Sequence, residues 1–320
     1  MLNGKCSSWA DVLSGVPQGS VLGPILFLIF INDVDSAVEF INILRKFADD
    51  TKLGQPASTP EERELLQRAL DNLCEWAKKW GMEFNVKKCK VMHFGFNNPA
   101  QSYRMEDQQL EVTEEERDIG VSVTRTLKPS AQCAKAAKMA QSVLSQVSRA
   151  FHFRDRHIFL ILYIQYIRPH LEFAAAAWSP WPESDKDLLE KVQRRAVSMI
   201  SGLQGKSYEE KLKELGITTL EERRHQSDMV QTYKILHGHD KVKSDTLFVR
   251  ADQSNVQTRS ATGPMNLRHQ AARLEVRRNF FSQRVVENWN KVPTNIKMAC
   301  TVNSFKRGYK KHRAELVVPT

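Results

Sequence analysis

Residues 41–53 read Ile-Asn-Ile-Leu-Arg-Lys-Phe-Ala-Asp-Asp-Thr-Lys-Leu, and this stretch decides the fold of the N-terminal part of the chain. Two short apolar runs flank an Asp-Asp pair, which is the pattern of a β-hairpin with carboxylates at its tip. We therefore predict a hairpin that presents Asp49 and Asp50, with Phe47 packed in its sheet. Two adjacent acids taken alone are usually a solvated turn, so their meaning depends on the surrounding sequence.

A loop rich in Gly and Pro precedes the hairpin. Residues 15–24 read Gly-Val-Pro-Gln-Gly-Ser-Val-Leu-Gly-Pro, which predicts a turn. The apolar run 25–31 that follows fits a buried strand or a buried helix, because periodicity does not separate the two. We favour a buried helix, since Ser20 can cap it and Pro24 can occupy its first turn.

Helix signals are clearest after the hairpin. Thr59 followed by Pro60 and Glu62 predicts a capping box, and apolar residues at helical spacing extend the helix to about Trp80. Beyond it we expect a strand pair at 82–84 and 90–94 that returns to the sheet, then a polar linker or exposed loop at 97–118, and a short strand at 119–123.

The chain after residue 125 is predicted to be helical, with helices at 131–151, 158–167, 188–200 and 280–290. Two further capping boxes, Ser207 with Glu210 and Thr219 with Glu222, each open a helix. The fold class is therefore α+β. The tryptophans Trp76, Trp80 and Trp289 are expected in the core rather than as base-stacking platforms.

Several ordered motifs resemble those of reverse transcriptases. Residues 47–50, Phe-Ala-Asp-Asp, are similar to the F/Y-A-D-D box of that family, and 15–24 are similar to its loop that positions template and nucleotide. Residues 80–90 resemble the following palm segment, in which Asn85 and Lys88 match an N-x-x-K motif.

The resemblance continues to the end of the chain. Residues 117–121 are similar to the start of the thumb in jockey-like and CR1-like elements, which are non-LTR (LINE-type) retrotransposons. Residues 208–216, 220–224, 233–238 and 281–293 are similar to their C-terminal region. This implies a partial polymerase palm at 1–125, in which helices pack on an antiparallel sheet with the Asp-Asp hairpin. A helical thumb-like region at 126–205 and a helical, basic C-terminal region at 206–320 follow.

The resemblance also implies functional roles. Asp49 is the expected ligand of catalytic Mg²⁺ and Asp50 a supporting or weaker one, which agrees with the hard oxygen ligands that Mg²⁺ prefers. Lys88 is a candidate general acid for the leaving pyrophosphate, although a solvated lysine beside Lys87 and Lys90 fits the sequence equally well.

The loop residues have roles by resemblance too. Gln18 and Gly19 are expected to contact template or nucleotide through a compact turn that Gly15 and Pro17 shape. The implied partners are an RNA template, a DNA primer and deoxynucleotides, whereas the oligomeric state stays open.

One part of the family pattern is missing. The family has another metal-binding aspartate on a palm strand well before the Pro-Gln-Gly loop, and only 14 residues precede Gly15. We therefore expect a fragment of an RNA-directed DNA polymerase that is inactive alone. The alternatives are a transposon remnant kept as a nucleic-acid-binding or interaction protein, and a truncated gene product whose upstream frame encodes the aspartate.

Charge is distributed unevenly along the chain. Residues 251–320 contain 13 Lys or Arg and 4 Asp or Glu, so this segment carries almost all of the net charge of +10. A basic tail on a near-neutral body favours a polyanionic partner such as nucleic acid, although a solvated basic face is nearly as good an explanation.

Other features exclude several classes of protein. The five cysteines contain no C-x-x-C pair, which argues against a zinc ribbon or a disulfide framework. His237 and His239 are interpreted as a turn, not a metal site. No secretory signal opens the chain, and the apolar run 21–31 is about half of what spans a bilayer. We expect an intracellular protein, nuclear or cytoplasmic, with no membrane partner.

Overall fold

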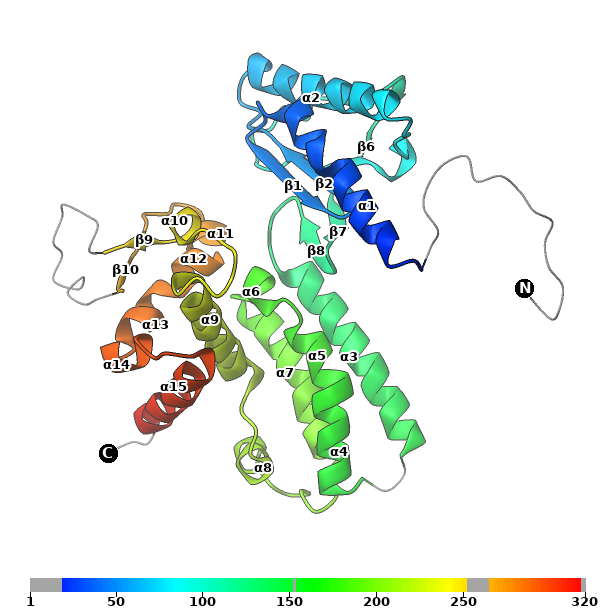
Figure 1. Cartoon of the computed structure of the whole chain (residues 1–320). Helices are drawn as coiled ribbons and strands as arrows, with labels where there is room; N and C mark the ends of the chain where they lie inside the picture. Colours follow the sequence, from blue (N-terminus) through cyan, green and yellow to red (C-terminus); the bar gives the residue numbers. More distant parts are fainter. Residues whose placement is uncertain (1–18, 152–153, 252–264, 318–320) are drawn as a thin grey trace. The chain divides into compact units, whose positions relative to one another are not determined.

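The computed structural model describes residues 19–151, 154–251 and 265–317, and the chain divides into two compact units between Glu114 and Glu115. Both units combine helices with small two-stranded sheets (Figure 1), which confirms the α+β class. Each unit is described by itself. The predicted boundaries at residues 125 and 205 stay predictions.

The first unit begins with helix α1 (Leu22–Phe30), which continues directly into the 3₁₀ helix η1 (Ile31–Val38). Helix was thus the correct choice for this apolar run. The Ser20 hydroxyl accepts a hydrogen bond from the backbone N–H of Gly23 at 3.0 Å, as the capping prediction required. Strands β1 (Ile43–Phe47) and β2 (Asp50–Gly54) follow and pair antiparallel.

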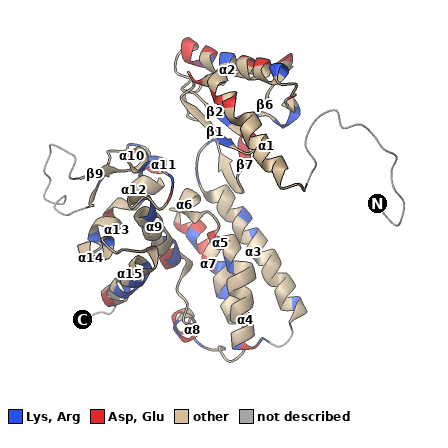
Figure 2. Ribbon diagram, in the orientation of Figure 1, with Lys and Arg blue, Asp and Glu red and all other residues tan. Residues whose placement is uncertain are grey.

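Helix α2 (Pro60–Lys79) organises this unit. Its predicted capping box is present: the Thr59 hydroxyl accepts from Glu62 N–H, and the Glu62 carboxylate accepts from Thr59 N–H. One side of α2 packs on α1, η1 and the hairpin through Leu73 and Trp76, and another packs on the segment after residue 82 through Leu70. Its charged residues follow the remaining side (Figure 2).

The predicted strand pair at 82–84 and 90–94 is wrong. Residues 82–84 form no strand, because the N–H of Met82 bonds Ala77 O at the end of α2 and Phe84 O accepts from Val86 N–H. A short 3₁₀ helix η2 (Val86–Lys88) follows, and only strand β3 (Lys90–Val91) forms within 90–94. It pairs in parallel with β6 (Glu111–Val112), not with the Asp-Asp hairpin.

The segment 97–118, predicted as a linker or exposed loop, is folded. Strands β4 (Arg104–Met105) and β5 (Gln108–Gln109) form a tight antiparallel pair. Tyr103, Met105 and Leu110 are buried in a small cluster with Leu70 and Cys74 of α2. Three apolar residues spaced through a polar segment are enough to fold it onto a helix face.

The second unit opens with the hairpin of β7 (Glu115–Asp118) and β8 (Val121–Thr124). Its first cluster is helical and contains α3 (Ser130–Ala150), α4 (Arg156–Leu162), the π-helical turn η3 (Tyr163–Ile167), α5 (Arg168–Glu172), α6 (Ala175–Trp178), α7 (Glu183–Ser198) and α8 (Tyr208–Leu215). Their apolar faces form one core that includes Leu144, Tyr163 and Leu189. The capping box of Ser207 and Glu210 is present as predicted.

A polar network lies inside this cluster. The buried amide of Gln193 donates to Tyr208 Oη at 2.8 Å and to Glu190 Oε1 at 3.1 Å, and its oxygen accepts from the Tyr163 hydroxyl. Glu190 also accepts the backbone N–H of Leu220 at 3.0 Å, at the first turn of the next helix. A buried carboxylate with several donors is tolerated because its charge is satisfied.

The second cluster surrounds Trp289 and comprises α9 (Leu220–Leu236), α10 (Ser244–Leu247), β9 (Val249–Arg250), β10 (Leu267–Arg268), α11 (Glu275–Arg278), α12 (Phe281–Arg284), α13 (Val286–Lys291), α14 (Thr294–Lys297) and α15 (Val302–Val317). Tyr233, Trp289 and Phe305 stack at its centre. The strands β9 and β10 correct the all-helical prediction. The Asn290 amide holds β10 through both backbone groups of Leu267.

The Thr219 cap is confirmed in part. Its hydroxyl accepts from Glu222 N–H at 3.2 Å, but the Glu222 carboxylate binds the Arg313 guanidinium of α15, with 2.6 Å between Oε2 and Nη2. Helix α15 is therefore tied to α9 by an ion pair as well as by its apolar face. The sequence pattern could not reveal this partner 91 residues away.

The described residues contain no helix long and apolar enough to cross a membrane. Cys74, Cys89, Cys133 and Cys300 are free thiols. The His-Gly-His sequence forms a turn at the end of α9, as predicted, and Gly238 has a φ of +69°.

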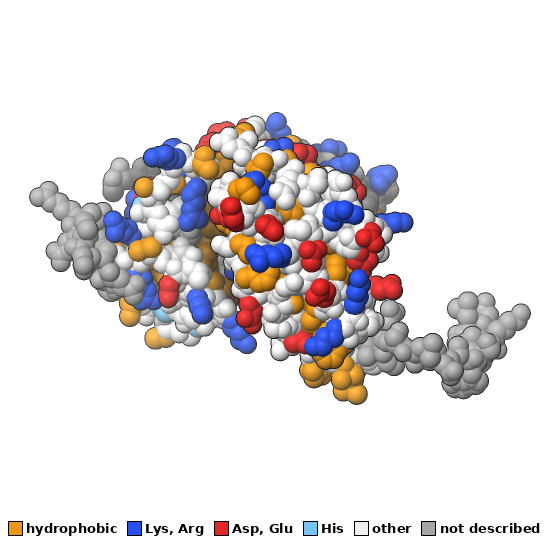
Figure 3. Space-filling view, turned by 90° about the horizontal axis from the view of Figure 1, so that it is seen from above, with side chains coloured by type: hydrophobic (Ala, Val, Ile, Leu, Met, Phe, Trp, Pro, Cys, Tyr) orange, Lys and Arg blue, Asp and Glu red, His pale blue; other side chains and the backbone are white. Residues whose placement is uncertain are grey.

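Helix α1 is not buried, contrary to the prediction. Leu22, Ile25, Leu28 and Ile29 are each at least half exposed, and only Gly23 of the helix is buried. Figure 3 shows hydrophobic side chains gathered at the surface along one edge of the view. Such a continuous apolar face marks an interaction surface or an aggregation site.

We expect this face to make the chain associate in solution. Replacing Leu28 with Lys and Ile29 with Glu should raise the monomer fraction in sedimentation velocity without lowering stability, because both side chains are already in solvent. The matched control places the same charges at exposed Met139 and Ile161 of the second unit. Equal association of the two variants, or a monomeric parent chain, would contradict the expectation.

Candidate active site

The Asp-Asp pair lies at the turn of the β1–β2 hairpin. The register pairs Phe47 with Asp50, so Ala48 and Asp49 form a two-residue connection and Asp50 begins β2. Ala48 has a φ of +52°. Two-residue hairpin turns need a positive φ at their first central residue, because only such turns match the twist of the strands. Both carboxylates are solvent-exposed.

Phe47 does not pack in the sheet, and 60% of it is exposed. Side chains alternate across a strand, and the face of β1 that approaches the core carries Leu44 and Lys46. Phe47 lies on the opposite face with Ile43 and Arg45. An aromatic side chain beside two exposed carboxylates is therefore part of the surface around the turn.

The hairpin is held on η1 by a lysine. Lys46 Nζ lies 2.6 Å from Asp35 Oδ1 and donates to the carbonyl oxygens of Ile31 at 3.3 Å and Asn32 at 3.4 Å. Below it, Leu44 of β1 and Leu53 of β2 pack on the apolar cluster of α2. The carboxylates are thus carried on a hairpin with one anchored face.

Sequence reasoning missed Lys46 as a positioning residue. The two-residue period of β1 places it on the same face as Leu44, and that is the signal that could have identified it. Its acceptors on η1 lie 11 to 15 residues earlier, and nothing local in the sequence indicates them.

Lys88 lies on η2, and its side chain is exposed. The backbone N–H of Lys88 bonds Asn85 O at 2.9 Å, so the N-x-x-K spacing forms one tight turn. A broad cavity of about 760 Å³ lies beside Asn85 and Lys87, but Lys88, Asp49 and Asp50 are not among its lining residues.

The predicted binding loop falls mostly outside the described residues. Gly15, Pro17 and Gln18 lie there, so their roles stay predictions. Gly19 is described: it is an exposed turn residue three positions before the start of α1, with a φ of +82° that favours glycine.

Comparison with known proteins connects this geometry to a family. Residues 2–149 match the family described as reverse transcriptase (RNA-dependent DNA polymerase). Residues 2–149, slightly under half of the chain, are thus similar to reverse transcriptases, and the chain is similar to RNA-directed DNA polymerases of mobile elements. The matched residues include Gly19, the Asp-Asp hairpin and Lys88, and they end near the end of α3.

Curated proteins similar to this chain include polymerases of fruit-fly mobile elements. The RNA-directed DNA polymerase from mobile element jockey is 33% identical over 100 residues in Drosophila melanogaster and over 133 residues in Drosophila funebris, which is 29% and 39% of this chain. The probable RNA-directed DNA polymerase from transposon X-element of Drosophila melanogaster is 24% identical over 203 residues, or 60% of this chain. These matches span 11%, 14% and 22% of the relatives' own lengths. No solved structure matches the chain.

The reverse transcriptase family implies Mg²⁺, and the hairpin fits it in part. Asp49 and Asp50 offer exposed hard oxygens at one turn, which is the donor type that Mg²⁺ prefers. Within the described ranges, however, no three or more His, Cys, Asp or Glu side chains form a group that could hold a metal ion.

The conformation of Ala48 gives a direct test of the turn. A β-branched side chain tolerates a positive φ worse than alanine does, so Ala48→Val should lower the free energy of unfolding by about 1–2 kcal/mol. Ala48→Gly at the same position should not destabilise the chain, because glycine carries no Cβ. Urea titration of both variants provides the measurement, and a neutral Val variant would show that the turn is not left-handed.

Proposed function

We propose that this chain is part of an RNA-directed DNA polymerase in which Asp49 and Asp50 hold catalytic Mg²⁺. The observation that carries the proposal is the hairpin turn, which exposes both carboxylates on an anchored support within the residues matched by the reverse transcriptase family. RNA template, DNA primer and deoxynucleotides are the corresponding partners.

Bound Mg²⁺ would stabilise the negative charge that develops during nucleotidyl transfer. Asp49 would be the main ligand, because it occupies the turn itself, and Asp50 would support it from the first position of β2. The loop that includes Gly15, Pro17, Gln18 and Gly19 would position template and nucleotide. Lys88 would protonate the leaving pyrophosphate, for which an exposed ammonium on a short 3₁₀ turn is available.

We further propose that the chain alone lacks polymerase activity. Among the described residues, no third His, Cys, Asp or Glu joins Asp49 and Asp50 in a group that could hold a metal ion, and the apolar face of α1 is exposed. Further polymerase segments would supply ligands and cover this face, which agrees with the small share of the relatives' lengths that this chain matches.

Primer extension on an RNA template tests this directly. With Mg²⁺ and all four deoxynucleotides, the purified chain should give no extension above a blank. The Asp49→Ala variant serves as the matched control, since its exposed side chain contributes nothing to the core. Extension by the parent chain that disappears in Asp49→Ala would refute inactivity and support the assignment of Asp49.

A second candidate function is nucleic-acid binding without catalysis, and helix α15 favours it. Lys306, Arg307, Lys310 and Lys311 are all exposed on α15, while Phe305 and Tyr309 anchor its opposite face in the core (Figure 2). Residues four apart stack along a helix, so these cations form a basic stripe on a rigid support. Such a stripe suits the phosphate backbone of a strand.

Replacing all four stripe residues with Gln should weaken binding to single-stranded RNA and flatten its salt dependence. Each lost phosphate contact lowers the slope of log K against log salt by about 0.7, so a loss of roughly 3 is expected. The control variant neutralises four exposed cations elsewhere, at Lys191, Arg195, Lys241 and Lys243. Equal slopes for the two variants would rule out the stripe as the contact.

A further inference from the structure

Lys297, the last residue of α14, lies inside the second cluster and is only 2% exposed. Its Nζ donates to Asn266 Oδ1 at 2.7 Å and to the carbonyl oxygen of Asn290 at 3.3 Å. The ring centroid of Trp289 lies 5.7 Å from the same nitrogen. These three partners are uncharged, whereas lysine is almost never fully buried without a paired charge.

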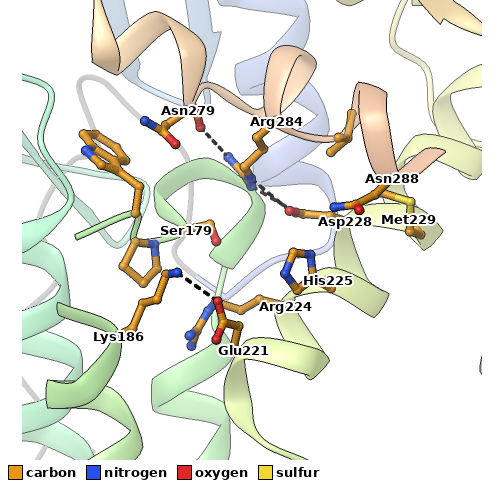
Figure 4. A pocket seen from close by; sticks show the side chains of 13 residues that line it. Ser179, Lys186, Glu221, Arg224, His225, Asp228, Met229, Asn279, Arg284 and Asn288 are labelled. Carbon is orange, nitrogen blue, oxygen red and sulfur yellow. Dashed lines mark hydrogen bonds and ion pairs between the residues drawn. The ribbon is translucent and has the colours of Figure 1, made fainter. Parts of the chain in front are cut away.

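Other cations of the second unit show the usual arrangement. In Figure 4, Lys186 Nζ lies 2.9 Å from Glu221 Oε1, and Arg284 Nε lies 2.9 Å from Asp228 Oδ2. Burial opposes the charge of Lys186, but its hydrogen bonds to two carboxylates outweigh burial and raise its pKa. A carboxylate thus keeps a partly buried cation charged, and the contacts of Lys297 include none.

Arg224 is also buried, with 5% of it exposed, and it offers a second comparison. Burial lowers the pKa of Arg224, and the carboxylates of Glu190 and Glu221 offset part of that effect. A guanidinium nevertheless stays protonated in a protein, whereas the amine of a buried lysine can lose its proton. Burial therefore has a consequence for Lys297 that it does not have for an arginine.

The contacts of Lys297 suit the neutral amine better than the ammonium. An ammonium has three N–H donors, and loss of the proton leaves two. Asn266 Oδ1 and Asn290 O accept two hydrogen bonds, so they satisfy the neutral form and leave one donor of the charged form over. The Trp289 ring compensates weakly, because cation–π attraction extends to only about 6 Å. Burial lowers the pKa of Lys297 to about 8.

The titratable groups of the neighbouring elements leave Lys297 without an opposite charge. Glu287 and Lys291 of α13 are exposed and paired with each other at 2.6 Å. Tyr233 of α9 and Tyr309 of α15 are buried in the cluster, and burial raises the pKa of both, that of Tyr309 to about 12. The thiol after α14 and the cations of β10 and of the α15 stripe are exposed: Cys300, Arg268, Lys306, Arg307, Lys310 and Lys311.

We propose that Lys297 makes the stability of the second cluster depend on pH, with the cluster most stable once the amine has lost its proton. A lysine in the unfolded chain keeps its proton up to about pH 10.4. The buried amine releases it about two units earlier, so the unfolded chain binds more protons between these values. The free energy of unfolding then rises with pH from about 8 to 10 and stays at its lower level below pH 8.

The position of Lys297 extends this effect to helix α15. Ile296 lies against α15, where a Cβ on Gly308 would meet its Cγ2 at 3.3 Å, and the Ala299 carbonyl accepts the Tyr233 hydroxyl between the two helices. Hydrating the ammonium requires this segment to open, which also loosens the start of α15. The inference concerns the folding of the cluster and holds whether or not the α15 stripe binds nucleic acid.

Nuclear magnetic resonance on the full chain, labelled with ¹³C at lysine Cε, measures the loss of the proton directly. One lysine signal should titrate near pH 8 and be absent from the Lys297→Met variant. The Lys297→Arg variant gives the same assignment if the Met variant does not fold. A signal of Lys297 that titrates above pH 10, like an ordinary exposed lysine, would overturn the proposal.

Urea titration of the full chain at pH 7.0 and pH 9.5, followed by circular dichroism, measures the effect on stability. The unfolding equilibrium constant of the parent chain should fall about 25-fold more between these pH values than that of Lys297→Met. Lys297→Gln, a second neutral variant that keeps an N–H donor, should behave like the Met variant. Each variant is compared with itself at the two pH values, so a general loss of stability does not affect the result.

Two further variants separate a buried charge from a general effect of pH. Lys291→Gln removes an exposed lysine of α13 and should keep the pH dependence of the parent chain. Lys297→Arg stays charged at both pH values, so its stability should respond to pH no more than that of the Met variant. Equal pH dependence in the parent chain and in Lys297→Met, or its loss in Lys291→Gln, would refute the role of Lys297.

Discussion

Helix α2 must bury two faces at once, and the arrangement of the first unit depends on that requirement. Leu73 and Trp76 face α1, η1 and the hairpin, while Leu70 and Cys74 face the small strands that follow η2. A single 20-residue helix therefore replaces the broad sheet that usually forms the centre of an α+β domain. The indole N–H of Trp76 also donates to Asp33 Oδ1 at 3.1 Å, which fixes η1 on the helix. The position of the β1–β2 hairpin depends on α2 indirectly, because Lys46 of the hairpin binds η1 and η1 packs on α2.

Local signals in the sequence predicted the structure well where the cause was local. The Thr59 and Ser207 capping boxes depend on residues three apart, and both helices begin where the pattern indicated. The Asp-Asp hairpin is likewise determined by neighbouring residues, because it consists of two short strands joined by a two-residue turn. The predictions were wrong where contacts between residues far apart in the sequence determine the structure. Residues 82–84 have strand-like composition, yet Met82 and Phe84 lie against the two clusters of α2. The exposure of α1 could not be predicted either, because an apolar run does not reveal whether anything covers it.

The candidate active-site residues and the buried Arg224 differ in the same way. Asp49, Asp50 and Lys88 were found because they belong to short motifs. Arg224 belongs to no motif, and it was visible in the sequence only as one charged residue of an amphipathic helix. Its surroundings include Glu190 and Cys133, which are 34 and 91 positions away and come near it only in the folded chain. A buried charge is a tertiary property, so only a structure can identify it.

Helix α9 belongs to both clusters of the second unit. Its first residue, Leu220, is part of the core around Leu144, and Tyr233 near its end is part of the core around Trp289. Glu190 holds the beginning of the helix, and Arg313 is bound to its first turn from α15. Because α9 contributes apolar residues to both clusters, unfolding of one cluster would expose apolar surface of the other. The two clusters are therefore expected to unfold together. The second unit is then a single cooperative body with two cores.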